Sequence, residues 1–175
     1  RQRQMCIRDR DQHIYNAAIL VSPNGEILLK HRKINVLDIA RDIYSIGDTL
    51  SVAETELGTI ALNICADNFP SSLHFARSLA SMGADLLLSP CAWAVDPDHD
   101  NVKDPYGSLW LKSYGTISTE YNITIIGVSN VGNIPSGVWQ GRKCIGCSLT
   151  VGPGAQVIAQ APYGVNAETL EIVEV

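Results

Sequence analysis

The stretch IALNICADNFP, residues 60–70, decides how this sequence is interpreted. An apolar run ends at a single cysteine, Cys65, and the polar Asp67 and the helix-starting Pro70 follow closely. Residues 71–84 then carry apolar side chains at helical spacing. The stretch therefore predicts a strand that ends at Cys65 and a helix that begins near Pro70. At the carboxyl edge of a sheet, where α/β proteins place their sites, the Cys65 thiol is either a nucleophile or a buried packing residue.

The rest of the chain is a series of short apolar segments separated by turns. The segment SPNG (22–25) has the turn chemistry of a hairpin. The predicted elements are strands at 13–22, 26–33, 49–55, 58–65, 84–90, 123–130 and 170–175, a hairpin over 147–161, and helices at 71–84 and 106–122. This order predicts a layered α/β fold without an internal repeat or an interdomain linker.

Composition excludes several classes of protein. The chain has 175 residues, of which 46% are hydrophobic and 18% are charged, as expected of one packed domain. Its net charge of −5 offers no broad basic surface, so we expect no nucleic-acid partner. No apolar stretch approaches the roughly 20 residues that span a bilayer, so we expect no membrane association. Five cysteines, an odd number, suggest reduced thiols and a cytoplasmic location.

The first ten residues differ from the rest. RQRQMCIRDR (1–10) holds four arginines and one aspartate, and it has neither helical nor strand periodicity. The string MCIRDR resembles translated adaptor sequence. We therefore interpret residues 1–10 as a non-native segment, exclude Cys6 from the site, and assign residues 11–175 to a single domain.

Lys33 ends the run KHRK (30–33) at the end of the second predicted strand. Such a run is usually a solvated strand end. A lysine close to a strand-end cysteine is, however, suited to hold the anionic oxygen of a tetrahedral intermediate. Lys33 and Cys65 are therefore candidates for one catalytic site.

Five segments together resemble the carbon–nitrogen hydrolase, or nitrilase, superfamily. The likeness extends over roughly residues 14–165. The segments, in chain order, are HRKINV (31–36), LNICADNFP (62–70), GADLLLSPCAW (83–93), WLKSYGTISTEYNITIIGVSNVG (110–132) and GCSLTVGPGAQVIAQA (146–161).

The resemblance implies an α-β-β-α sandwich of the nitrilase type, incomplete at its N-terminus, with a Glu-Lys-Cys triad. Cys65 is then the nucleophile, Lys33 steadies the oxyanion, and the backbone N–H of Ala66 is the second oxyanion donor. The implied reaction cleaves a small amide, nitrile or carbamoyl compound through a thioester. The resemblance implies no metal or organic cofactor, and it implies a homodimer for the complete protein.

The resemblance also suggests a pocket around the nucleophile. Asp67, two residues after Cys65, is assigned to this pocket or to the oxyanion site. Cys91 lies near the place where the family's pocket wall falls, and Trp93 is a further candidate for the pocket. Taken alone, Cys91 is better explained as a small packing residue, and Trp93 either lines a pocket or an interface or packs in the core or at its rim.

One departure from the family pattern concerns the general base. The family's catalytic glutamate precedes its lysine, but the only glutamate before Lys33 is Glu26, which follows the turn at 22–25. We interpret Glu26 as part of a hairpin tip. The chain is therefore expected to be a C-terminal piece of a hydrolase, inactive alone.

Two other interpretations remain open. The chain can be a non-catalytic scaffold or regulatory member of the same fold. Cys144 and Cys147 form a single CxxC, which also occurs in redox and zinc sites. No second CxxC or nearby histidine completes a metal site in the sequence.

Overall fold

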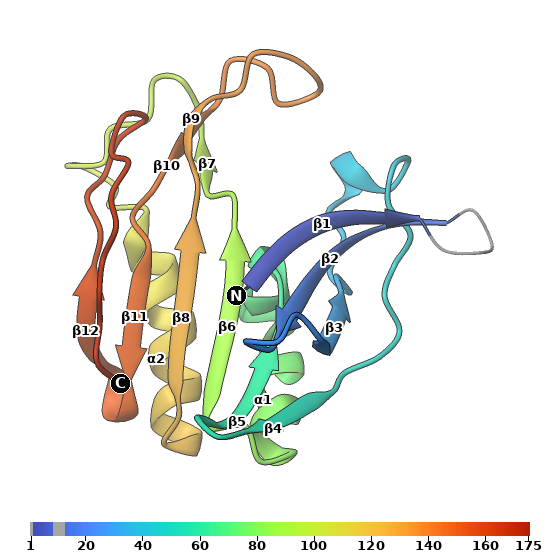
Figure 1. The fold of residues 1–175 in the computed structure, drawn as a ribbon. Coiled ribbons are helices and arrows are strands. Elements are labelled where there is room, and N and C mark those ends of the chain that lie inside the picture. The colour runs from blue at the N-terminus through green and yellow to red at the C-terminus, as the bar shows by residue number, and fades with distance from the viewer. Residues whose placement is uncertain (1, 9–12) are drawn as a thin grey trace. The chain divides into compact units, whose positions relative to one another are not determined.

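The computed structural model describes residues 2–8 and 13–175. The chain forms two compact units, an N-terminal unit up to Pro90 and a C-terminal unit from Cys91. Each unit combines strands with helices (Figure 1). The expected α/β class is confirmed. No helix among the described residues is long and apolar enough to cross a bilayer.

The N-terminal unit begins with an antiparallel sheet in the order β1-β2-β3. Its strands are β1 (Gln2–Arg8), β2 (Ile14–Val21) and β3 (Ile27–Arg32). The β2–β3 hairpin turns through Gly25, whose φ of +88° suits glycine, and the Glu26 N–H donates to Ser22 Oγ at 3.1 Å. The predicted hairpin is confirmed. Residues 2–8, whose sequence has no strand periodicity, form β1 by backbone pairing with β2.

The second sheet of this unit contains the predicted strand before Cys65. Its strands are β4 (Val52–Thr55), β5 (Gly58–Leu62) and β6 (Leu86–Cys91). β4 pairs with β5 in antiparallel fashion, whereas β5 and β6 are parallel, with Ile60 opposite Leu86. A parallel pair needs a crossover, and the chain supplies it with η2 (Cys65–Asn68), η3 (Pro70–Ser72) and α1 (Leu73–Ser81). The predicted helix after Pro70 is confirmed.

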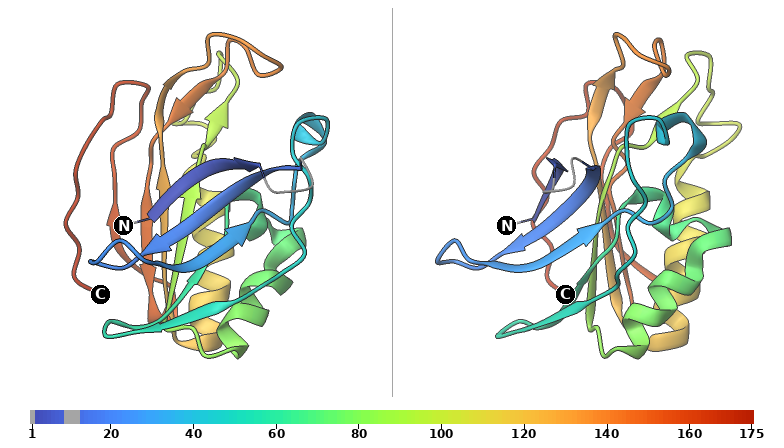
Figure 2. Two further views of the ribbon diagram at one scale, coloured as in Figure 1. Left: turned by 45° about the vertical axis from the view of Figure 1, so that its right-hand side comes forward. Right: turned by 90° about the vertical axis from the view of Figure 1, so that its right-hand side faces the viewer.

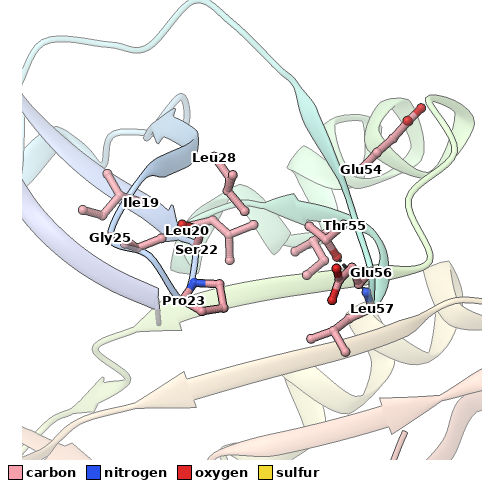
Figure 3. A pocket seen from close by; sticks show the side chains of 12 residues that line it. Ile19, Leu20, Ser22, Pro23, Gly25, Leu28, Glu54, Thr55, Glu56 and Leu57 are labelled. Atoms are coloured by element: carbon pink, nitrogen blue, oxygen red, sulfur yellow. Dashed lines mark hydrogen bonds between the residues drawn. The ribbon is translucent and has the colours of Figure 1, made fainter.

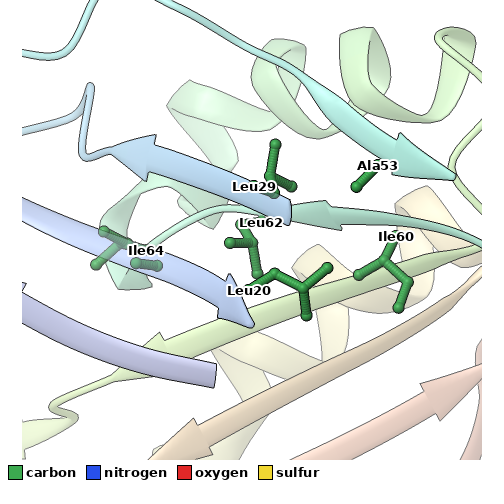
Figure 4. Close-up of a cluster of buried hydrophobic side chains, with 7 residues drawn as sticks. Leu20, Leu29, Ala53, Ile60, Leu62 and Ile64 are labelled. Carbon is green, nitrogen blue, oxygen red and sulfur yellow. The ribbon is translucent and has the colours of Figure 1, made fainter. Parts of the chain in front are cut away.

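The core of the N-terminal unit lies between its two sheets. Alternate residues of β2 and β5, such as Leu20, Ile60 and Leu62, turn their side chains into one apolar cluster (Figure 4). Leu29 of β3 joins the same cluster. Figure 2 shows α1 on the side of β5 and β6 that faces away from β2 and β3. Within this unit the layers therefore follow the order helix, sheet, sheet.

The C-terminal unit holds the long helix α2 (Gly107–Tyr121) and two antiparallel sets of strands. α2 buries Trp110, Tyr114 and Ile117 and ends at Asn122, which has a left-handed φ of +58°. The strands are β7 (Ala94–Val95), β8 (Thr124–Ser129), β9 (Val131–Asn133), β10 (Lys143–Ile145), β11 (Leu149–Gly152) and β12 (Gln156–Gln160), with η4 (Pro153–Ala155) turning the last hairpin.

The predicted helix, the strand after it and the final hairpin of this unit are confirmed. The strands β9 and β10 were not predicted, because each has only three residues and so shows too little periodicity. The predicted strand at 170–175 is wrong: this segment is not a strand, and its apolar Leu170 and Ile172 are 88% and 90% exposed. The alternation there lacks a sheet on which to pack.

Candidate active site

Cys65 lies in the short turn between β5 and α1. The strand ends at Leu62, three residues earlier than predicted, and Cys65 begins η2. Its φ of +46° is in the left-handed region, which is costly for a residue with a Cβ and recurs at functional sites. The Cys65 N–H donates to Ser89 Oγ at 3.3 Å. The residue is half-buried, whereas Cys91, Cys144 and Cys147 are buried.

Ala66 is the residue after Cys65, and its backbone N–H and C=O differ in whether they have a hydrogen-bond partner. The carbonyl accepts hydrogen bonds from Asn35 Nδ2 at 2.8 Å and from the Phe69 N–H at 3.1 Å. No described residue accepts a hydrogen bond from the Ala66 N–H, although the residue is fully buried. Buried amides are nearly always paired, so this N–H is suited to a ligand oxygen.

Asp67 holds two loops together. Its Oδ2 accepts hydrogen bonds from His31 Nε2 and the Ile64 N–H, both at 2.9 Å. Its Oδ1 accepts from the Ile34 N–H at 3.2 Å and the Asn35 N–H at 2.7 Å. The residue is fully buried. This placement differs from the expected position in a pocket, because all four hydrogen bonds join chain segments to one another.

Asn35 adds a second connection between the same segments. Its Nδ2 donates to the Ala66 carbonyl and to Ser72 Oγ, the latter at 2.7 Å. Sequence analysis did not single out Asn35, and it gave His31 no role. No local signal would have revealed them, because their partners lie more than thirty residues along the chain.

Lys33 lies immediately after β3, between His31 and the two amides that Asp67 binds. Its own N–H donates to the Asn16 carbonyl at 2.8 Å, and its carbonyl accepts from the Gly47 N–H at 2.9 Å. The residue is only 9% exposed. Within residues 13–175 no carboxylate forms an ion pair with it. A buried ammonium without a carboxylate partner is suited to a negative charge that develops on a ligand.

Replacing Gly47 with alanine is expected to disturb this part of the site. A Cβ on Gly47 would lie 2.1 Å from the Arg32 carbonyl oxygen, so the backbone before Lys33 must shift. We expect the free energy of unfolding in urea to fall by about 1–3 kcal/mol. Gly107→Ala is the matched control, because its Cβ meets only the end of the Gln160 side chain and alanine favours a helix. Equal stability of the two variants would contradict the close approach.

Cys91 and Trp93 belong to the core of the C-terminal unit. Cys91 Sγ lies 3.9 Å from Tyr114 Oη. The fully buried Trp93 ring stacks on Trp110 with centroids 4.6 Å apart, and the backbone N–H of Trp93 donates to Ser129 Oγ at 2.9 Å. These surroundings favour the packing interpretation of both residues.

The CxxC pair shows the features of structural cysteines. Cys144 and Cys147 are both buried. Burial raises the pKa of the Cys147 thiol, which disfavours the thiolate that redox chemistry needs. Among the described residues no group of three or more metal-binding side chains comes together.

A groove of about 1200 Å³ opens elsewhere on the N-terminal unit (Figure 3). Its lining is mainly apolar and includes Leu20, Leu28 and Leu57, with Glu54 and Glu56 at one wall. Neither Lys33 nor any residue from Cys65 to Asp67 lines it. The groove is therefore distinct from the turn that carries the candidate nucleophile.

Residues 4–175 match the family model for carbon–nitrogen hydrolases, and the chain belongs to this family. Among relatives, it is 28% identical over 146 residues to a probable nitrilase of Schizosaccharomyces pombe, covering 83% of this chain and 47% of that protein. It is 27% identical over 149 residues to a cyanide hydratase of Penicillium rubens, covering 82% of this chain and 39% of that protein. The chain thus spans half or less of the length of these relatives.

Solved structures show the same fold. A carbon–nitrogen hydrolase from Helicobacter pylori G27 superposes with a TM-score of 0.83 at 22% identity, covering 93% of this chain and 58% of that one. An amidase variant from Nesterenkonia sp. AN1, with acrylamide added at its active-site cysteine, gives 0.73 at 22% identity and covers 93% and 59%. The expected nitrilase-type fold is confirmed.

Proposed function

We propose that this chain carries the nucleophile and the oxyanion site of a hydrolase that cleaves carbon–nitrogen bonds in small amides, nitriles or carbamoyl compounds. One observation carries the proposal. The strained, half-buried Cys65 and the buried Lys33 lie on two loops that the Asp67 carboxylate joins directly. The Nesterenkonia amidase, whose active-site cysteine reacts with acrylamide, supports a thiol nucleophile and a small amide substrate.

In the proposed mechanism the Cys65 thiolate attacks the amide carbon. The carbonyl π electrons move to the oxygen, and the Lys33 ammonium and the Ala66 N–H stabilise the resulting oxyanion. The intermediate collapses as the C–N bond breaks, and the leaving nitrogen takes a proton to depart as ammonia or an amine. Water then attacks the thioester, which releases a carboxylic acid and returns the thiol.

The proton transfers need a general base, which we assign to a glutamate outside this chain. Glu26 does not suit the role, because it is an exposed residue next to the turn between β2 and β3. We therefore propose that residues 11–175 are part of a larger catalytic domain and are inactive alone. Residues 1–10 as adaptor-derived sequence, the homodimer and the cytoplasmic location stay predictions.

The test measures ammonia release from a panel of small amides, nitriles and carbamoyl compounds. This chain is assayed beside a longer polypeptide that restores the coding sequence upstream of residue 11 in its gene. We expect release by the longer polypeptide alone. Release by the short chain would overturn the assignment of the base. Silence of a folded longer polypeptide on the whole panel would overturn the hydrolase and favour the non-catalytic scaffold.

A further inference from the structure

We propose that Asp67 is a positioning residue that holds the Lys33 ammonium against the Cys65 sulfur. This inference rests on the proposed function, since it assumes that Lys33 and Cys65 act on the same reacting group. Asp67 itself touches no substrate in this account. It acts through the two loops that its carboxylate binds.

Asp67 accepts hydrogen bonds from both loops. His31, two residues before Lys33, donates to Oδ2, and the two residues directly after Lys33 donate their backbone amides to Oδ1. The lysine is therefore bracketed on both sides by one carboxylate. The Ile64 N–H, directly before Cys65, donates to Oδ2. Any displacement of one loop relative to the other must break bonds to this single group.

The hydrogen bonds of the Asp67 carboxylate are buried. Asp67 is fully buried and His31 is 3% exposed, so water competes poorly for these hydrogen bonds. Hydrogen bonds to an ionised acceptor are shorter and stronger than neutral ones. A buried carboxylate is costly to place, and here all of its described partners lie within three residues of Lys33 or Cys65. The hydrogen bonds that compensate for burying the Asp67 carboxylate are therefore the same ones that fix the Lys33 loop relative to the Cys65 loop.

An amide cannot replace the Asp67 carboxylate. Oδ1 and Oδ2 each accept two hydrogen bonds. An asparagine side chain at this position would offer one acceptor oxygen and one NH₂ group, and in either orientation the NH₂ group would face at least one backbone N–H, with which it cannot form a hydrogen bond. Asp67→Asn is therefore expected to release one loop while it leaves side-chain volume nearly unchanged.

The experiment compares the rates at which iodoacetate and iodoacetamide alkylate Cys65. A nearby ammonium attracts the anionic reagent but not the neutral one, so the rate ratio reports the proximity of Lys33 to the sulfur. Digestion with trypsin separates the thiols, because the peptide 42–77 contains Cys65 as its only cysteine. The measurement of the rate ratio needs neither a substrate nor catalytic turnover.

In the original chain we expect an iodoacetate-to-iodoacetamide ratio above that of glutathione. Lys33→Gln is expected to lower the ratio by about fivefold, the effect of one nearby unit charge in water-like screening. Asp67→Asn is expected to lower it by at least half as much on a logarithmic scale. Asp85→Asn is the matched control, since Asp85 also accepts a hydrogen bond from a backbone amide, that of Thr59, and neither residue belongs to the loops that carry Lys33 and Cys65.

His31 supplies the second pair of variants, in case Asp67→Asn does not fold. His31→Gln keeps a side-chain N–H for Oδ2 and is expected to preserve the ratio, whereas His31→Leu removes that donor and is expected to lower it. Folding of each variant is checked by circular dichroism. A loss of structure that only exposes the thiol would raise the rates of alkylation by both reagents.

The outcomes separate this inference from the proposed function. If Lys33→Gln lowers the ratio while folded Asp67→Asn and His31→Leu leave it unchanged, Asp67 does not position the lysine and the inference is overturned. If Lys33→Gln itself leaves the ratio unchanged, the lysine does not face the sulfur and its proposed catalytic role is overturned as well.

Discussion

Replacement of Cys65 with alanine is expected to abolish ammonia release by the active polypeptide, a loss on the order of 10⁴-fold or more. Alanine cannot form the covalent intermediate, and the oxyanion donors alone give only a small residual rate. The rate of ammonia release at saturating substrate measures the loss. Near-full activity in folded Cys65→Ala would mean that another nucleophile carries the reaction.

Cys144→Ala is the matched control for this experiment. Cys144 is a buried thiol on β10, and no step of the proposed mechanism uses it. The control is expected to retain the rate of the original protein. A comparable loss in both variants would indicate a structural effect of removing buried sulfur rather than the loss of a nucleophile.

Asp67→Ala is expected to lower the free energy of unfolding by about 4 kcal/mol or more. The substitution removes the acceptor of four hydrogen bonds inside the N-terminal unit. Each buried donor left without a partner costs about 1 kcal/mol or more. Because whole domains are stable by only about 5–15 kcal/mol, this loss would remove a large share of the stability of the folded state. Urea unfolding followed by circular dichroism measures it.

The same measurement on Asp85→Ala provides the comparison. Asp85 is exposed and accepts one backbone hydrogen bond, from the Thr59 N–H at 2.8 Å. We expect its removal to cost no more than about 1 kcal/mol. If the two alanine variants unfold at the same urea concentration, the network around Asp67 does not have the stabilising role assigned to it.

Local patterns in the sequence predict much of the fold. The apolar run before Cys65, the helix after Pro70 and the SPNG (22–25) hairpin all appear where they are expected. These elements carry their own periodicity or turn residues, so neighbouring residues suffice to identify them. The strand at 2–8 and the absence of one at 170–175 depend instead on whether a partner strand lies alongside.

The candidate site was predictable only in part. Cys65 and Lys33 stand out because each ends a strand-like segment, and chain order is enough to see that. The role of Asp67 was not predictable, because His31 lies 36 residues away and no spacing rule joins them. For Cys91 and Trp93, both of which are buried, the sequence could not decide between the core and a pocket wall, because apolar residues in the two places look alike in sequence.

If Cys65 is the nucleophile, its sulfur becomes acylated during the reaction. This is measured by mixing the active polypeptide with an amide that it hydrolyses, quenching the reaction in acid within the first turnovers, and determining the mass of the protein. We expect an increase in mass equal to the acyl group, located on the peptide 42–77 and absent in Cys65→Ala. Ammonia release without an adduct on that peptide, or an adduct that persists in Cys65→Ala, would contradict it.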